Sequence, residues 1–165
     1  MSKMIHQIQQ FLFMNPWVVM IAALVLLVLA VILPKRFKIP LLVAYVLFIV
    51  TMTLLTRKVK QRPANWDPLK VYEKFIRGGT TRWEVIYNVV LFIPLGAMIS
   101  SVKPKLIWTA IALSICIELI QLVFGLGECE LGDVILNGAG SFVGAGISSL
   151  VRKVIQRTDQ QRLMK

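Results

Sequence analysis

Three pairs of an acid and an amide recur at helical spacing in or beside the apolar stretches of this chain. Each acid precedes its amide by three or four residues: Glu84 with Asn88, Glu118 with Gln121, and Asp133 with Asn137. Residues at this spacing share one face of a helix. A carboxylate can act as a general acid or base, and an amide can hydrogen-bond a ligand or a neighbouring helix. The spacing therefore predicts three helix faces that could line one polar site.

Glu118 lies deepest in an apolar run, within the segment IELIQLVF at residues 117–124. An ionised acid at the middle of a bilayer costs about 2.5–3.5 kcal/mol, and less near the interface. Such a group normally faces the interior of a helix bundle, or it stays neutral because burial disfavours its charged form. Glu118 is therefore a candidate catalytic acid or base. Asp133 is a second candidate, and its alternative is a structural role as a helix N-cap.

The two cysteines provide neither a disulfide framework nor a CxxC motif. Cys116 falls in an apolar run, where we expect it to pack as a small side chain. Cys129 lies in the acidic segment and is placed to be reactive. Together with Glu128, Glu130 and Asp133 it lacks the Cys/His spacing typical of zinc sites. No metal site is therefore predicted, and the sequence identifies no cofactor.

The composition indicates that these residues belong to a membrane protein. Of 165 residues, 57% are hydrophobic and only 16% are charged, whereas a soluble domain has about half apolar and a quarter charged residues. The expected fold is all-α, an integral membrane bundle of about five transmembrane helices, and nucleic acid is not an expected partner. Five stretches approach the ~20 apolar residues that cross a bilayer: residues 16–33, 40–56, 85–102, 106–124 and 134–151.

The connections between these stretches divide the chain into four predicted regions. Residues in the 57–83 segment include eight Lys or Arg. Within it, Val71, Phe75 and Ile76 could form one face of a short interfacial helix that ends at Gly78–Gly79. The regions are two N-terminal transmembrane helices (1–56), a basic loop with this interfacial segment (57–83), a three-helix region (84–151) and a basic tail (152–165).

The charges give a weak prediction of orientation. Five spans would place ten Lys or Arg on the side of the C-terminus and nine on the other side, so the positive-inside rule is nearly balanced. Seven of the eight acids fall on the side of the 57–83 and 125–133 loops. This asymmetry favours extracytoplasmic loops and a cytoplasmic C-terminus. The basic run at 57–62, directly beside a span end, argues for the opposite orientation.

Alternating span directions bring the polar residues to one side of the membrane. At 1.5 Å per residue, Glu118 lies roughly 9 Å inside its span and Asn137 roughly 6 Å inside its own. We therefore expect one polar cluster in one leaflet, where bases of the 57–83 loop could pair with acids or hold a phosphate. For Asn88, Gln121 and Asn137 a purely structural role between helices has equal weight.

Small residues predict how the spans pack together. Gly140, Gly144 and Ser148 form a small-xxx-small series that permits close approach of a neighbouring helix. Pro94 and Gly96 in LFIPLG predict a kink in the third span, where neighbouring groups must satisfy the freed carbonyl.

Three motifs resemble those of a known family. NVVLFIPLG at 88–96, IELIQ at 117–121 and ELGDVILNGAG at 130–140 occur in an order similar to that of the VanZ-like family of bacterial membrane proteins. NWDP at 65–68 resembles the Asn-x-x-Pro segment that precedes the third span of that family. The resemblance covers over half of the chain. It implies roles for the matching polar residues, which are Asn88, Glu118, Gln121, Glu130, Asp133 and Asn137.

Two departures from the family pattern affect the acidic turn. Many relatives carry an arginine three residues before the first acid, where this chain has Gly127. Many also have paired aspartates where this chain has Gly132–Asp133. An Arg–acid pair within the turn is thus absent. Arg57, Arg62 or Arg82 would have to substitute for it.

The resemblance also implies a biological setting. The family is named for a glycopeptide-resistance component associated with reduced teicoplanin susceptibility, which implies the bacterial cytoplasmic membrane and a link to the cell envelope. We expect the protein to bind or modify an envelope amphiphile through the polar cluster. The partner would be a membrane lipid or a cell-envelope precursor, and a lipoglycopeptide is a further candidate. The alternative is a non-catalytic membrane protein that affects envelope assembly, with a purely structural polar cluster. A second copy of the chain is a further candidate partner, in a homo-oligomer, and enzymatic activity stays undecided.

Overall fold

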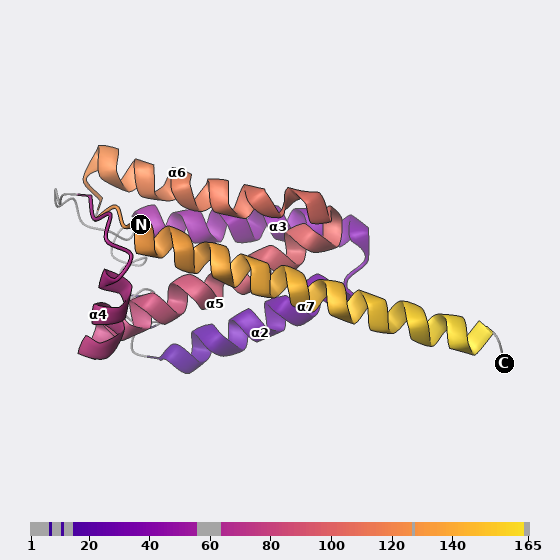
Figure 1. Ribbon diagram of the computed structural model, residues 1–165. Coiled ribbons are helices and arrows are strands. Elements are labelled where there is room, and N and C mark those ends of the chain that lie inside the picture. Colours follow the sequence, from indigo (N-terminus) through magenta and orange to yellow (C-terminus); the bar gives the residue numbers. More distant parts are fainter. Residues whose placement is uncertain (1–6, 8–10, 12–14, 56–63, 127, 164–165) are drawn as a thin grey trace.

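The computed structural model describes residues 7, 11, 15–55, 64–126 and 128–163, and these form a helical bundle (Figure 1). Within these ranges there is no strand, only an isolated parallel bridge between Asn65 and Glu130. The predicted all-α membrane bundle is confirmed. Its elements are α2 (Pro16–Ile32), α3 (Lys35–Val50), the π-helix η1 (Thr51–Leu55), α4 (Lys70–Arg77), α5 (Gly79–Val102), the 3₁₀-helix η2 (Pro104–Ile107), α6 (Trp108–Phe124) and α7 (Leu131–Leu163).

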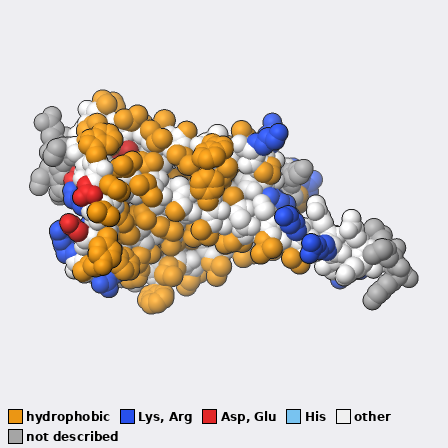
Figure 2. Space-filling model, viewed as in Figure 1, with side chains coloured by type: hydrophobic (Ala, Val, Ile, Leu, Met, Phe, Trp, Pro, Cys, Tyr) orange, Lys and Arg blue, Asp and Glu red, His pale blue; other side chains and the backbone are white. Residues whose placement is uncertain are grey.

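Four helical segments of the described chain are long and apolar enough to cross a membrane. The fifth apolar helix, α2, has 17 residues and is shorter. Figure 2 shows apolar side chains covering the flank of the bundle, with charged side chains gathered toward its two ends. Such a continuous apolar surface is expected to face lipid rather than water. The four segments are Arg36–Leu54, Gly79–Val102, Pro104–Phe124 and Leu131–Arg162.

The turn between α2 and α3 is set by proline. Leu33 is extended (φ −60°, ψ 143°) because the residue before a proline avoids the helical region. Helix α3 then begins directly after Pro34, five residues earlier than predicted. Pro40 consequently lies inside α3 and not in its first turn.

Helix α7 is longer than the predicted fifth span. It has 33 residues and continues through the basic segment after Val151 as far as Leu163. At 1.5 Å per residue, a helix of this length extends about 50 Å, and its C-terminal part projects beyond the other helices in Figure 1. No proline or glycine interrupts the chain after Gly146, so nothing local ends the helix at the membrane boundary. The division into four regions itself stays a prediction.

Helices α5 and α7 make the most extensive contact of the bundle. A Cβ atom at Gly144 would lie 1.8 Å from the carbonyl oxygen of Ile93, and one at Gly140 would lie 2.2 Å from that of Val89. From the other side, a Cβ at Gly96 would lie 1.9 Å from the carbonyl oxygen of Ser141. The backbones therefore approach as closely as the small-residue series predicts.

Helix α5 is continuous through Pro94, which is buried. Proline has no N–H to donate to the carbonyl four residues earlier, and the next carbonyl along, that of Leu91, accepts a hydrogen bond from the Tyr45 hydroxyl at 2.7 Å. Tyr45 thereby connects α3 to α5. The buried apolar core around this contact includes Ile49, Phe92, Leu95 and Met98.

Candidate functional site

One end of the bundle gathers polar residues from α6, α7 and the turn between them. We call Glu118, Gln121, Glu130, Asp133 and Asn137 the polar cluster. Each of these residues exposes at most 7% of its surface. The cluster is the arrangement that alternating span directions predict, because α6 ends and α7 begins at the same end of the bundle.

A glycine-containing turn brings Glu130 back to Glu118. Gly125 adopts a left-handed conformation (φ 61°) at the end of α6, a typical helix termination. The N–H of Leu126 then donates to the Gln121 carbonyl at 2.8 Å. As a result, the backbone N–H of Glu130 donates to Oε2 of Glu118 at 2.9 Å, in a buried position. The deepest carboxylate thus has a hydrogen-bond donor, as a buried polar group requires.

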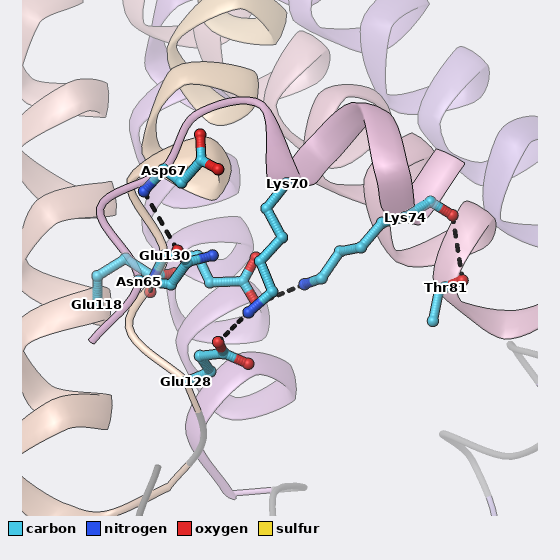
Figure 3. Close-up of polar contacts among 8 residues, drawn as sticks. All are labelled: Asn65, Asp67, Lys70, Lys74, Thr81, Glu118, Glu128 and Glu130. Atoms are coloured by element: carbon cyan, nitrogen blue, oxygen red, sulfur yellow. Dashed lines mark hydrogen bonds and ion pairs between the residues drawn. The ribbon is translucent and has the colours of Figure 1, made fainter. Parts of the chain in front are cut away.

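Two lysines of α4 contact the acidic turn, which is the segment that joins α6 to α7. Lys70 forms an ion pair with Glu128, and Lys74 forms one with Glu130 (Figure 3). The lysines are four residues apart, so they lie on one face of the helix. These ion pairs connect residues that are 58 and 56 positions apart in the sequence.

The Lys74 ammonium group remains charged despite its partial burial. Burial lowers its pKa, but the hydrogen bond to Glu130 and the charges of Asp133, Glu130 and Glu84 outweigh this effect, so the pKa is raised. Lys74 therefore stays available as a cation for its pair with Glu130.

The NWDP segment lies against the same turn. The Asn65 N–H donates to the Cys129 carbonyl at 2.8 Å, and the Asn65 carbonyl accepts from the Leu131 N–H at 3.1 Å. The side chain of Asn65 accepts from the Asp67 N–H at 3.2 Å, which turns the chain toward α4. The Asn-x-x-Pro segment therefore positions α4 over the acidic turn.

Helix α4 has a face toward the protein and a face away from it. A Cβ atom at Gly132 would lie 2.2 Å from a methyl of Val71, so Val71 packs directly on the start of α7. Leu69, Tyr72 and Ile76 are exposed. The predicted short helix that ends at Gly78 is confirmed. Of its predicted apolar face, Val71 packs on α7, whereas Phe75 and Ile76 are exposed.

Amides connect the deeper part of the polar cluster to other helices. Nδ2 of Asn137 donates to Oγ of Ser114 on α6 at 2.8 Å. Nε2 of Gln121 donates to the Thr53 carbonyl at 3.4 Å. Thr53 lies in the π-helix η1, where the widened turn leaves backbone carbonyls available to side chains.

Several buried polar atoms of this region have no hydrogen-bond partner in the described part of the chain. They are the acceptor oxygens Oε1 of Gln121, Oε2 of Glu130 and Oδ1 of Asn137, and the donor nitrogen Nδ2 of Asn65. Leaving such a group unsatisfied costs about 1–3 kcal/mol. The arrangement can therefore accept hydrogen bonds from hydroxyl or ammonium groups. No three His, Cys, Asp or Glu among the described residues converge as metal ligands do.

The structure places Cys129 and Asp133 differently from two of the sequence-based expectations. Cys129 is buried, and burial together with the charges of Glu118, Asp133 and Glu130 raises the pKa of its thiol. The expectation of a reactive Cys129 is therefore wrong, since a reactive cysteine is an accessible thiolate. Asp133 is not the N-cap of α7 but lies in its first turn. The helix dipole stabilises a carboxylate at this position.

The remaining predicted site residues lie around the polar cluster or outside the described residues. Asn88 is half-buried on α5. The Arg82 guanidinium lies over the Phe75 ring, and its Nε donates to the Phe75 carbonyl at 3.0 Å. Arg57 and Arg62 lie outside the described residues. In the described chain the acids of the turn are paired with lysines of α4, and Arg82 does not substitute for the missing arginine.

Sequence reasoning missed five residues that contact the polar cluster or its turn. Lys70 and Lys74 carried a signal, since two lysines at helical spacing oppose two glutamates, Glu128 and Glu130, that are also on one turn. Asn65 carried a signal only through the NWDP motif that it begins. Thr53 and Ser114 carried none, because each acts through a contact between distant segments.

Comparison with known proteins identifies the family. A family model described as VanZ/LLP1 matches residues 17–152. The chain belongs to the VanZ/LLP1 family. It is also similar to "Protein VanZ" from Enterococcus faecium, with 31% identity over 110 residues that cover 63% of each chain. The VanZ-like chain thus spans less than two thirds of that relative. No solved structure matches it significantly.

The VanZ-like motifs have two distinct structural roles. The Glu-x-x-Gln of α6, the acidic turn and the Asn-x-x-Pro segment meet at one end of the bundle. The third-span motif instead contributes Gly96, which allows α5 to approach α7. A VanZ-like chain with these apolar helices is a multi-pass membrane protein.

Proposed function

We propose that this protein acts in the bacterial cytoplasmic membrane and reduces teicoplanin susceptibility by binding or modifying an envelope amphiphile at the polar cluster. Membership of the VanZ/LLP1 family and similarity to "Protein VanZ" support the link to glycopeptide resistance. The observation that carries the site is the set of buried acceptor oxygens on Gln121, Glu130 and Asn137.

These acceptors favour a particular ligand chemistry. A ligand that donates hydrogen bonds, through sugar hydroxyls or an amino group, would satisfy oxygens that are otherwise costly to bury. Lys70 and Lys74 are already paired with glutamates. A phosphate would have to replace those carboxylates, so we assign recognition to the hydroxyl- or amine-bearing part of the amphiphile.

Helix α4 offers a route for such a ligand. It covers the acidic turn, and it joins α5 through Gly78 and Gly79, both with positive φ. The exposed side chains of Leu69, Tyr72 and Ile76 suit the boundary between headgroups and acyl chains. Rotation of α4 about its glycine joint would open the polar cluster toward the membrane interface.

If the amphiphile is modified and not only bound, Glu118 and Asp133 are the catalytic candidates. Both are buried near the unpartnered acceptors, and buried carboxyl groups suit general acid–base catalysis. The N–H of Glu130 orients the Glu118 carboxylate, which fixes the oxygen that would face a substrate.

Matched neutral variants test the proposal. Glu118→Gln and Glu130→Gln remove charge while keeping size, and Glu73→Gln makes the same change at an exposed position of α4. In a teicoplanin-susceptible host that expresses each variant, we expect the first two to lose most of the protection and Glu73→Gln to retain it. Folded yield in detergent must stay comparable. Full protection by both buried variants would contradict the proposed site.

A non-catalytic role in envelope assembly is the second candidate. The contacts of Glu130 with Glu118 and Lys74 hold α4, α6 and α7 together and favour a structural role for the cluster. Under this alternative, Glu118→Gln and Glu130→Gln reduce protection only in proportion to the loss of folded protein. Size-exclusion chromatography of each variant, compared with its teicoplanin tolerance, separates the two functions.

A further inference from the structure

A second polar arrangement lies at the opposite end of the bundle from the polar cluster. Nη1 of Arg152 donates to Oγ of Ser148 at 2.9 Å. Nη2 donates to Oγ of Ser100 at 3.1 Å and to Oγ of Ser149 at 3.2 Å. The Arg152 guanidinium on α7 thus points toward the last turn of α5.

A row of hydroxyl groups holds this arginine in place. Oγ of Ser101 donates to the Ala30 carbonyl at 2.9 Å and lies 3.3 Å from Oγ of Ser148. Ser100, Ser101 and Ser148 are all buried. Serine hydroxyls of α5 and α7, anchored to a backbone carbonyl of α2, therefore lie beneath one cation.

This cation has no acidic partner among the described side chains. The ion pairs recorded there join Lys70 to Glu128 and Lys74 to Glu130, both at the other end of the bundle. Figure 2 shows Lys and Arg side chains, without Asp or Glu, where α7 extends beyond the apolar flank of the bundle. A partly buried charge without a counter-ion is costly. An anion from outside the chain would compensate it.

We propose that Arg152 and Ser149, with Ser100 positioning the guanidinium, bind a phosphate group, either on an anionic phospholipid or on a soluble phosphate ester. Guanidinium carries five N–H donors in a planar fork that matches phosphate oxygens. Oγ of Ser149 accepts from Arg152 and Ser149 is only half-buried, so its own hydrogen can turn toward the phosphate. The buried Ser100 hydroxyl lies 3.5 Å from that of Ser149 and supports it from below. Exposed Leu150 and Ile155 flank the arginine along α7, which places the site where acyl chains meet headgroups.

The test uses the full chain in detergent micelles and compares variants of equal charge. Arg152→Gln removes the cation of the site, and Lys153→Gln removes an exposed neighbouring cation. Adding phosphatidylglycerol should raise the thermal midpoint of the parent and of Lys153→Gln by several degrees, relative to phosphatidylcholine. The rise should be lost in Arg152→Gln and reduced in Ser149→Ala and Arg152→Lys.

Inorganic phosphate forms the second arm of the test. A rise with phosphate equal to that with phosphatidylglycerol assigns the site to soluble phosphates, and a rise with the lipid alone assigns it to headgroups. Equal loss in Arg152→Gln and Lys153→Gln, or no rise in the parent with either anion, would overturn the proposal. If Arg152→Gln fails to fold, an unreduced rise in both Ser149→Ala and Arg152→Lys overturns it equally.

Discussion

Glu130 contacts the polar cluster through its backbone and helix α4 through its carboxylate. Its N–H donates to Glu118, and its side chain pairs with Lys74. Removing one partner of a buried ion pair costs about 3–5 kcal/mol, whereas an exposed pair contributes at most about 1 kcal/mol. Lys74 and Glu130 expose 15% and 5% of their side chains, and Lys70 and Glu128 expose 35% and 17%. We therefore expect Lys74 to contribute more than Lys70 to the free energy of unfolding.

Replacing each lysine by methionine tests this difference. Lys74→Met leaves the Glu130 carboxylate buried without a cation, so we expect a loss of about 3 kcal/mol in the free energy of unfolding. Lys70→Met is the matched control and should cost less than about 1 kcal/mol. Denaturant unfolding in detergent measures both. A double variant with Glu130→Gln should recover part of the loss, and equal effects of the two lysine variants would disprove the ranking.

Cys129 provides a prediction about pH. Because burial and three neighbouring carboxylates raise the thiol pKa in the folded protein, the unfolded chain ionises first as pH rises. Stability should therefore decline above the ordinary thiol pKa and be unaffected below it. In a Cys116→Ala background, maleimide alkylation should need a higher pH in folded than in denatured protein. Identical pH profiles for the two states would refute the raised pKa.

At the scale of elements, the contact between α5 and α7 depends on positions without a side chain. The backbone oxygens opposite Gly140 and Gly144 lie where a Cβ would stand, whereas nothing lies within 4 Å of a Cβ at Gly146. Backbone atoms cannot move aside as the end of a flexible side chain can. Glycines of the same helix thus have different roles, and their surroundings rather than their spacing decide which.

Alanine substitutions on α7 test the close approach. Gly144→Ala forces α5 and α7 apart, and overpacking of this kind costs about 1–3 kcal/mol. Gly146→Ala meets open space and should be neutral or stabilising by up to about 1 kcal/mol, because alanine favours helix. The thermal midpoints in detergent measure both changes. A Gly144→Ala variant as stable as Gly146→Ala would show that the helices are not in close contact.

At the scale of the whole molecule, the two ends of the bundle differ in charge. Acids and bases mix at the end that holds the polar cluster, and only bases are visible where α7 emerges (Figure 2). Cytoplasmic ends of membrane proteins are enriched in Lys and Arg, and the anionic inner leaflet attracts them. This difference agrees with the orientation expected from the sequence, with α4 and the acidic turn outside the cytoplasm and the C-terminus within it, and that orientation stays a prediction.

Labelling of single cysteines tests that orientation. In a variant without Cys116 and Cys129, Glu73→Cys places a thiol on the exposed face of α4, and Arg157→Cys places one on the projecting end of α7. A membrane-impermeant maleimide should label the first in intact cells and the second only after permeabilisation. The reverse pattern would invert the orientation and move the polar cluster to the cytoplasmic leaflet.

The sequence by itself determined the class of fold and indicated two of the acid–amide pairs in the polar cluster, whereas Glu84 of the third pair is exposed and Asn88 is only half-buried. Apolar runs of bilayer length have few alternatives to membrane helices, because every backbone polar group must be satisfied within the helix. Acid–amide spacing then placed Glu118 with Gln121, and Asp133 with Asn137, on single helix faces. Alternating span directions brought these faces to one end.

Only the tertiary structure decided which groups are joined there. Lys74 meets Glu130, and Asn65 meets Cys129, across more than fifty residues of chain. Such contacts depend on the path of the connecting segment, which no local pattern encodes. The face that α4 turns toward the protein likewise depends on the fit of Val71 against Gly132. Spacing along a helix is a local property, whereas pairing between helices is decided by the packing of the whole bundle.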